Sequence, residues 1–133
     1  MMLTENDIVD LLGAYFEAKG CKIKKVTTKQ HGIDLEITTS DGQKTYIEAK
    51  GETSANEKSK RYSKPFTKNQ RWTHVSVALM KTFVLMCKPE HSGIRFGIAL
   101  PENHRDLTEK ISLIIKKVGI DIYFVSREGI TTL

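Results

Sequence analysis

Cysteine is scarce in this chain of 133 residues, which holds only Cys21 and Cys87. Disulfide-stabilised domains and thiolate metal sites need several cysteines at short, regular spacings. The two cysteines here lie far apart in the sequence, and the four histidines are equally scattered. We therefore expect two packed or free thiols in a reducing compartment, and neither a disulfide framework nor a cysteine-based metal site.

Long apolar runs are also missing. The most apolar stretch, residues 75–87, is shorter than a membrane span and is interrupted by polar side chains. The N-terminus turns acidic and polar within a few residues, unlike a secretory signal. The sequence shows no linker and no internal repeat. We expect a single cytoplasmic domain over residues 1–133, long enough to fold around its own core.

Two short segments, residues 32–37 and 46–51, alternate apolar and polar side chains with the period of a β-strand. A strand sends successive side chains to opposite faces, so Glu48 and Lys50 share one face of the second segment. An Asp-Gly pair between the segments is typical of a tight hairpin with antiparallel strands. That hairpin would bring Asp34 within reach of Glu48 or Lys50. Carboxylates beside a basic group form the layout of a site for a hard cation.

The residues Gly-Ile-Asp34 followed by Ile-Glu48-Ala-Lys50 resemble the signature of the PD-(D/E)xK nuclease superfamily. Ile33 stands where the name of the signature has proline, but the acid at position 34 is kept. The resemblance implies a restriction-endonuclease-like fold and a magnesium-dependent phosphodiesterase. In such a site Asp34, Glu48 and the Ala49 carbonyl would hold Mg²⁺ or Mn²⁺, and Lys50 would orient the attacking water. By the same resemblance the cut would leave a 5′ phosphate.

The wider pattern predicts an α/β fold with a mixed central sheet, in the order α-β-β-β-α-β followed by a further α-β unit. Thr4 and Asp7 form a capping-box pattern at the first helix, and Gly20 would end that helix. An antiparallel meander should lead through a helix to two parallel, buried strands. We expect a first helix over 4–20, a strand over 21–27, a hairpin over 33–50, a loop over 51–65, a helix over 67–87, a strand over 94–100, a helical pattern over 107–118 and a strand over 120–125.

The helix over 67–87 carries apolar residues at helical spacing, which predicts one buried face. These residues are Trp72, Val75, Leu79, Met80, Phe83 and Met86. Trp72 and the preceding Phe66 lie among basic residues and could stack on bases, but we expect them to anchor this helix to the core.

Positive charge is concentrated in one segment. The formal net charge of the chain is +5, and residues 57–71 alone hold six basic residues and one acidic residue, so the rest of the chain is neutral. A local basic cluster beside a candidate active site is typical of contact with nucleic-acid phosphates, although a solvated loop without a ligand is the plainer alternative. The candidate phosphate contacts are Lys58, Lys60, Arg61, Lys64, Lys68 and Arg71.

Two further residues each have two readings. Gln70 follows Thr67 at the spacing of a capping box, but superfamily members that resemble this chain often turn a glutamine on this helix toward the metal site. Glu5 would favour the positive end of the first helix dipole, but it also matches an acidic position that some family members add to the metal site. Glu36 and Glu52 are weaker candidates on the same alternating pattern.

The function predicted on these grounds is metal-dependent hydrolysis of DNA phosphodiester bonds, by an endonuclease of the restriction, repair or junction-resolving type. The alternatives are a non-enzymatic nucleic-acid-binding module on the same fold and a subunit whose basic loop docks an acidic protein. Sequence-specific cleavage by so small a chain should need a homodimer or a partner subunit. The sequence leaves open DNA versus RNA and the structure of the substrate.

Overall fold

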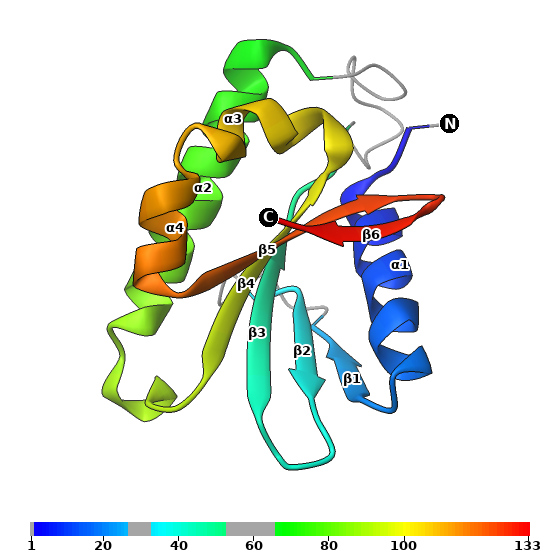
Figure 1. Ribbon diagram of the computed structural model, residues 1–133, viewed down its shortest axis with the longest axis vertical. Helices are drawn as coiled ribbons and strands as arrows, with labels where there is room; N and C mark the ends of the chain where they lie inside the picture. Colours follow the sequence, from blue (N-terminus) through cyan, green and yellow to red (C-terminus); the bar gives the residue numbers. More distant parts are fainter. Residues whose placement is uncertain (1, 27–32, 53–65) are drawn as a thin grey trace.

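The structure is a computed structural model that describes residues 2–26, 33–52 and 66–133 (Figure 1). Six strands form one open sheet in the same order as in the chain. The first three strands are antiparallel, β3, β4 and β5 are parallel, and β6 is antiparallel to β5. This is the mixed α/β sheet that the sequence predicts. The strands are β1 (Lys22–Lys25), β2 (Leu35–Thr38), β3 (Lys44–Ala49), β4 (Arg95–Pro101), β5 (Ile120–Ser126) and β6 (Gly129–Thr132).

Helices cover both faces of the sheet (Figure 1). One core cluster joins α1 to β2 and β3, and a second joins α2 and α4 to β4 and β5. None of the helices in the described residues has the length and apolarity needed to cross a membrane. The helices are α1 (Glu5–Ala18), α2 (Lys68–Met86), α3 (Arg105–Glu109) and α4 (Ser112–Val118), with short 3-10 turns η1 (Pro89–His91) and η2 (Glu102–His104).

The start of α1 has the predicted capping box. The Asp7 N–H donates to Thr4 Oγ1 at 3.2 Å, and the Thr4 N–H donates to Asp7 Oδ2 at 2.9 Å, so two helix-end donors are satisfied. Gly20 follows the helix with φ of 87°, a conformation that favours glycine. Both predicted limits of this helix are therefore confirmed.

The predicted hairpin is present, with Leu35 paired to Ile47 and the turn closed by Gly42 at φ of 88°. The regular strands are shorter than the alternation suggests, because β2 begins at Leu35 and β3 ends at Ala49. Asp34 and Lys50 consequently lie just outside the regular strands, although their backbone N–H groups still donate to the carbonyls of Ile47 and Ala99.

The predicted burial of α2 is wrong in part. Trp72 is 60% exposed and Met80 is 64% exposed, so neither anchors the helix. The face that packs on the sheet is narrower and consists of Val75, Ala78, Thr82 and Leu85. Thr82 can be buried because its hydroxyl donates to the Ala78 carbonyl at 2.7 Å. Phe83 is also partly exposed, at 38%.

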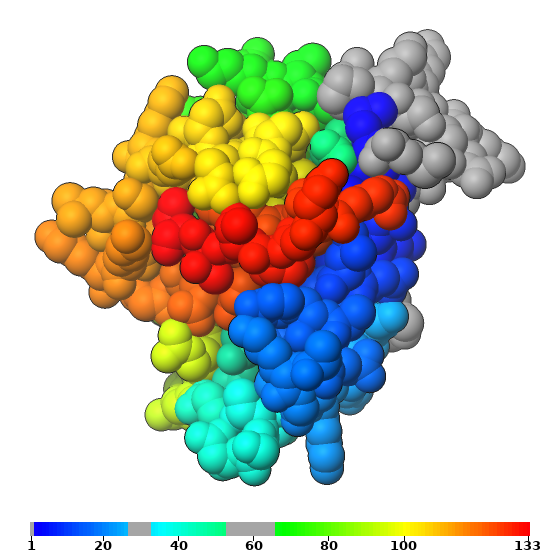
Figure 2. All heavy atoms as spheres, turned by 45° about the vertical axis from the view of Figure 1, so that its right-hand side comes forward, coloured from blue at the N-terminus to red at the C-terminus, as the bar shows by residue number. Residues whose placement is uncertain are grey.

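The C-terminal third differs from the prediction in two places. Strands β4 and β5 are parallel as expected, but the helical pattern over 107–118 is split into α3 and α4 because Ile111 leaves the helical conformation, with φ of −116° and ψ of 15°. Strand β6 was not predicted, since Ile130 is its one large apolar residue. The β5–β6 hairpin runs across the face shown in Figure 2, between α1 and the later helices.

Gly51 marks the contact between α1 and the end of β3. A Cβ at this position would lie 2.5 Å from the Glu5 nitrogen and 2.7 Å from the Thr4 carbonyl carbon, and backbone atoms yield little. Gly51→Ala should therefore lower the free energy of unfolding by about 1–3 kcal/mol in urea titrations.

Gly13→Ala is the matched comparison for Gly51→Ala. There the nearest atom is the flexible end of Ile23 at 2.9 Å, and alanine favours a helix over glycine by about 1 kcal/mol. We expect a clearly smaller loss at position 13. Equal losses at the two positions would contradict the proposed tight contact at Gly51.

Candidate active site

Asp34 is held where β2 separates from β3. Its N–H donates to the Ile47 carbonyl at 2.8 Å, and its Oδ2 accepts from the Ala49 N–H at 2.7 Å. The carboxylate thus takes the place of a backbone acceptor at the end of the ladder. Because the N–H and C=O of one strand residue point the same way, the Ala49 carbonyl also faces the β2 side.

Glu48 is the buried centre of the site, with only 4% of its surface exposed. Its Oε1 lies 3.4 Å from Lys50 Nζ and 3.7 Å from Lys81 Nζ, while its Oε2 has no hydrogen-bond partner. The structure therefore brings Asp34, Glu48 and Lys50 together, as the sequence predicts. It adds Lys81 from α2, which sequence reasoning missed.

A signal for Lys81 was present in the sequence. It is the single charged residue in the apolar stretch 75–87. On an amphipathic helix, a lone lysine next to a buried position such as Thr82 indicates that a carboxylate lies nearby.

The pKa values of the two acids reflect their shared burial. Burial raises the pKa of Asp34, against the lowering effects of the Ala49 N–H and the nearby lysines. Burial and then the charge of Asp34 raise the pKa of Glu48 to about 7. The buried Glu48 carboxyl therefore resists ionising beside the half-buried Asp34, so the site favours either a proton or an added cation.

The donors available for a cation are Asp34, the Oε2 of Glu48 and the Ala49 carbonyl. No group of three or more His, Cys, Asp or Glu side chains able to hold a metal occurs within residues 2–26, 33–52 and 66–133. A metal here would rely on two carboxylates, backbone and water, which suits Mg²⁺ better than a metal that prefers imidazole or thiolate.

A second polar cluster lies beside the site, at the N-terminal half of α2. The His74 and His104 rings are nearly parallel, at 8° and 5.9 Å between centroids, and the Phe66 ring packs edge-on against His74. Burial and the charge of Lys50 lower the pKa of His74, and burial lowers the pKa of His104 to about 4. Both rings are therefore neutral near pH 7.

The described residues contain four buried side-chain atoms that lack a hydrogen-bond partner. All four lie in or beside these two clusters, since the charge of Arg71 also lowers the pKa of His104. They are Glu48 Oε2, Arg71 Nε, His74 Nδ1 and His104 Nε2. Buried polar groups are normally paired, so a concentration of unpaired ones indicates a region shaped for function and not only for stability. No sequence motif predicted the histidine pair.

Gln70 has the structural role that its spacing predicted. Its Oε1 accepts from the Thr67 N–H at 2.8 Å, and its own N–H donates to Thr67 Oγ1 at 3.2 Å. The side-chain oxygen is therefore engaged by the helix cap. Glu5 is the first residue of α1, and its backbone lies against Gly51, one residue beyond Lys50.

The remaining sequence candidates have different positions. Lys68 is exposed in the first turn of α2, and Arg71 Nη2 lies 4.0 Å from Asp106 Oδ2. Glu52 Oε1 accepts from the Leu3 N–H at 2.6 Å, and Glu36 pairs with Lys44 at 3.5 Å. The other predicted phosphate contacts, Lys58, Lys60, Arg61 and Lys64, lie outside the described residues.

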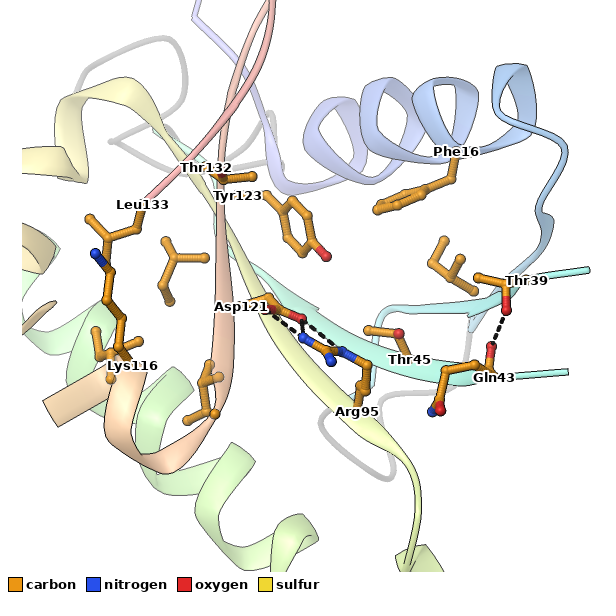
Figure 3. A pocket seen from close by; sticks show the side chains of 15 residues that line it. Phe16, Thr39, Gln43, Thr45, Arg95, Lys116, Asp121, Tyr123, Thr132 and Leu133 are labelled. Carbon is orange, nitrogen blue, oxygen red and sulfur yellow. Dashed lines mark hydrogen bonds and ion pairs between the residues drawn. The ribbon is translucent and has the colours of Figure 1, made fainter. Parts of the chain in front are cut away.

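A hollow of about 560 Å³ lies on the α1 side of the sheet and is separate from this site (Figure 3). Asp121 accepts two hydrogen bonds from Arg95 Nη2, at 3.0 and 2.9 Å, and burial raises the pKa of Tyr123 to about 12. The Asp121 carboxylate is thus already paired, and the Tyr123 hydroxyl is neutral. Glu48 lies on the other face of the sheet, toward α2. The hollow offers no comparable reactive group.

The raised pKa of Glu48 predicts a pH-dependent stability. Folding takes up a proton between the ordinary pKa of 4.5 and about 7, so stability present at low pH is lost as the pH rises through about 7. In metal-free buffer, Glu48→Gln should be more stable than the wild type by about 1–3 kcal/mol at about pH 8, with a smaller difference at about pH 5.

Urea unfolding at both pH values measures this effect. Glu17→Gln, an exposed change on α1, is the matched control and should show no such dependence. A wild type that is more stable than Glu48→Gln at high pH would contradict the assigned burial of charge.

Comparisons of the chain with protein-family models, with curated proteins and with solved structures found no match.

Proposed function

We propose that the chain is a metal-dependent endonuclease of restriction-endonuclease-like fold that hydrolyses DNA phosphodiester bonds. The observation that carries the proposal is the buried Glu48 with the half-buried Asp34 and Lys50 beside it. Paired acids next to a fixed ammonium suit metal-assisted phosphoryl chemistry, and the order of helices and strands agrees with the resemblance noted above.

The residues present fit Mg²⁺. The Oε2 of Glu48 is buried without a partner, and the pKa of both acids is raised, so a divalent cation would relieve an existing electrostatic cost. Mg²⁺ is commonly held by one or two carboxylates together with water and substrate phosphate. When bound, the ion would polarise the scissile phosphate and lower the pKa of a water molecule.

The chain's own groups would position the reactants. Lys50 is fixed by its ion pair with Glu48 and is 15% exposed, so its ammonium can orient the attacking water or stabilise developing charge on phosphate. Lys81 reaches the same carboxylate from α2 but is 49% exposed, which suits contact with an incoming phosphate. The basic segment 57–71 would hold the nucleic-acid backbone.

Cleavage tests on supercoiled, linear, single-stranded and branched DNA, with RNA alongside, examine this proposal directly. Asp34→Asn and Lys50→Ala should each reduce magnesium-dependent cleavage at least about 100-fold, because each removes a group that acts on the reacting phosphate. Melting temperatures show whether the variants remain folded.

Asp10→Asn and Lys117→Ala make the same chemical changes at exposed positions on α1 and α4 and should retain wild-type rates. Wild-type cleavage by either site variant would refute the assignment. Binding without cleavage by the wild-type chain on every substrate would favour the non-enzymatic alternative.

The basic segment makes a separate prediction about salt. Changing Lys58, Lys60, Arg61 and Lys64 together to alanine should shallow the slope of log affinity against log salt by about 3 to 4 units if each contacts a phosphate. The double change Lys116→Ala and Lys117→Ala on α4 is the control and should leave the slope unchanged. An unaltered slope in the quadruple variant would place the nucleic acid elsewhere.

A further inference from the structure

A pocket of about 380 Å³ lies next to the candidate active site, between the sheet and the end of α2. Lys24, Glu36 and Tyr46 form a row across β1, β2 and β3, since Lys24 pairs with Glu36 and Glu36 pairs with Tyr46. All three line the pocket. Glu48 is two residues beyond Tyr46 on the same face of β3, about 7 Å along the strand.

The chain approaches the active site along β2 in the same way. Ile33, which lines the pocket, directly precedes Asp34, and Val26, another lining residue, donates its N–H to the Asp34 carbonyl at 3.0 Å. Lining residues of the pocket thus lie one residue before Asp34 and two residues before Glu48. A group bound in the pocket could therefore belong to the same molecule as a phosphate held at Asp34 and Glu48.

The walls of the pocket suit a flat, partly apolar ring. Val26, Ile33 and Leu85 provide apolar surface, and the Tyr46 ring is held edge-on by His91 at 5.4 Å and by Phe96 at 5.9 Å. A tyrosine fixed in this way offers a stacking surface at little conformational cost.

Polar groups at the rim could read the edge of such a ring. His91 Nδ1 lies 2.9 Å from the Leu85 carbonyl, and since a carbonyl can only accept, Nδ1 carries the proton. In the neutral form of the ring this tautomer leaves Nε2 as an acceptor. Glu36 and Glu90 add carboxylates, and Lys24 and Lys88 add ammonium groups.

Cations connect the pocket with the acids. Lys81 lies 3.7 Å from Glu48, and Lys88 follows α2 at the pocket, so the helix side of the path carries positive charge. On the sheet side, Lys24 lines the pocket, and Lys44, which pairs with Glu36, lies two residues before Tyr46 on β3. A path with cations on its helix side and an aromatic pocket at one end matches a phosphate backbone carrying an unstacked base.

From this arrangement we propose that the pocket receives an unpaired nucleobase next to the scissile phosphate. The substrate class is then DNA with an unpaired nucleotide, such as a bulge or a single strand, in preference to fully paired duplex. This inference rests on the proposed nuclease function, because it assigns the scissile phosphate to Asp34 and Glu48.

The test compares three labelled duplexes that differ at one position: fully paired, with one bulged adenine nucleotide, and with one bulged abasic nucleotide. Affinity is measured by fluorescence anisotropy in metal-free buffer at one salt concentration. The wild type should bind the adenine bulge about tenfold more tightly than the abasic bulge, since the two differ only in the base. Equal affinity for the two bulges would overturn the proposal.

Two variants locate the effect. Tyr46→Ala and Lys88→Ala should each reduce the base-to-abasic ratio to less than about threefold, whereas Lys117→Ala on α4 should leave the ratio unchanged. Lys88 is exposed, so its variant remains informative if Tyr46→Ala unfolds. An unchanged ratio in both folded variants would place the base outside this pocket.

Cleavage of the same duplexes in Mg²⁺ separates the two proposals. Preference for the base without any cleavage would support the pocket and reject the nuclease function. Cleavage of all three duplexes at one rate, without a base preference in binding, would support the nuclease function and reject the pocket.

Discussion

The burial of Glu48 beside a second, half-buried acid is the constraint on which the rest of this structure depends. Asp34 and Glu48 lie at the point where β2 and β3 separate, where burial raises the pKa of both acids and the charge of Asp34 raises the pKa of Glu48 further. Two cations partly offset this rise in pKa. Lys50 approaches from the end of β3, and Lys81 approaches from α2. A fold that needed only stability would place apolar residues here, because buried charge rarely repays its desolvation.

Local sequence patterns predicted much of the fold and the residues at the centre of the candidate site. The alternation around Asp34 and Glu48, with an Asp-Gly turn between them, depends on contacts within one hairpin, so the sequence predicts it well. The caps at Thr4 and Thr67 are also local, since each involves residues three apart.

Features that depend on tertiary contacts were predicted less well. The helix α2 has apolar residues around much of its circumference, and the sequence alone does not say which of them meets the sheet; Trp72 does not, whereas Ala78 does. The contact of Lys81 with Glu48 and the stacking of His74 on His104 join segments far apart in the chain. Periodicity within one segment holds no information about such pairs.

The two outer strands bear on how copies of this chain can meet. In the described part of the sheet, β1 and β6 are the edges, and both are only four residues long. β1 reads Lys-Ile-Lys-Lys, so three of the four residues at this edge are lysines. Short, lysine-rich edges resist the addition of a strand from another molecule. Growth of the sheet from chain to chain is therefore disfavoured at β1, which protects a sheet with several apolar strands from edge-to-edge aggregation.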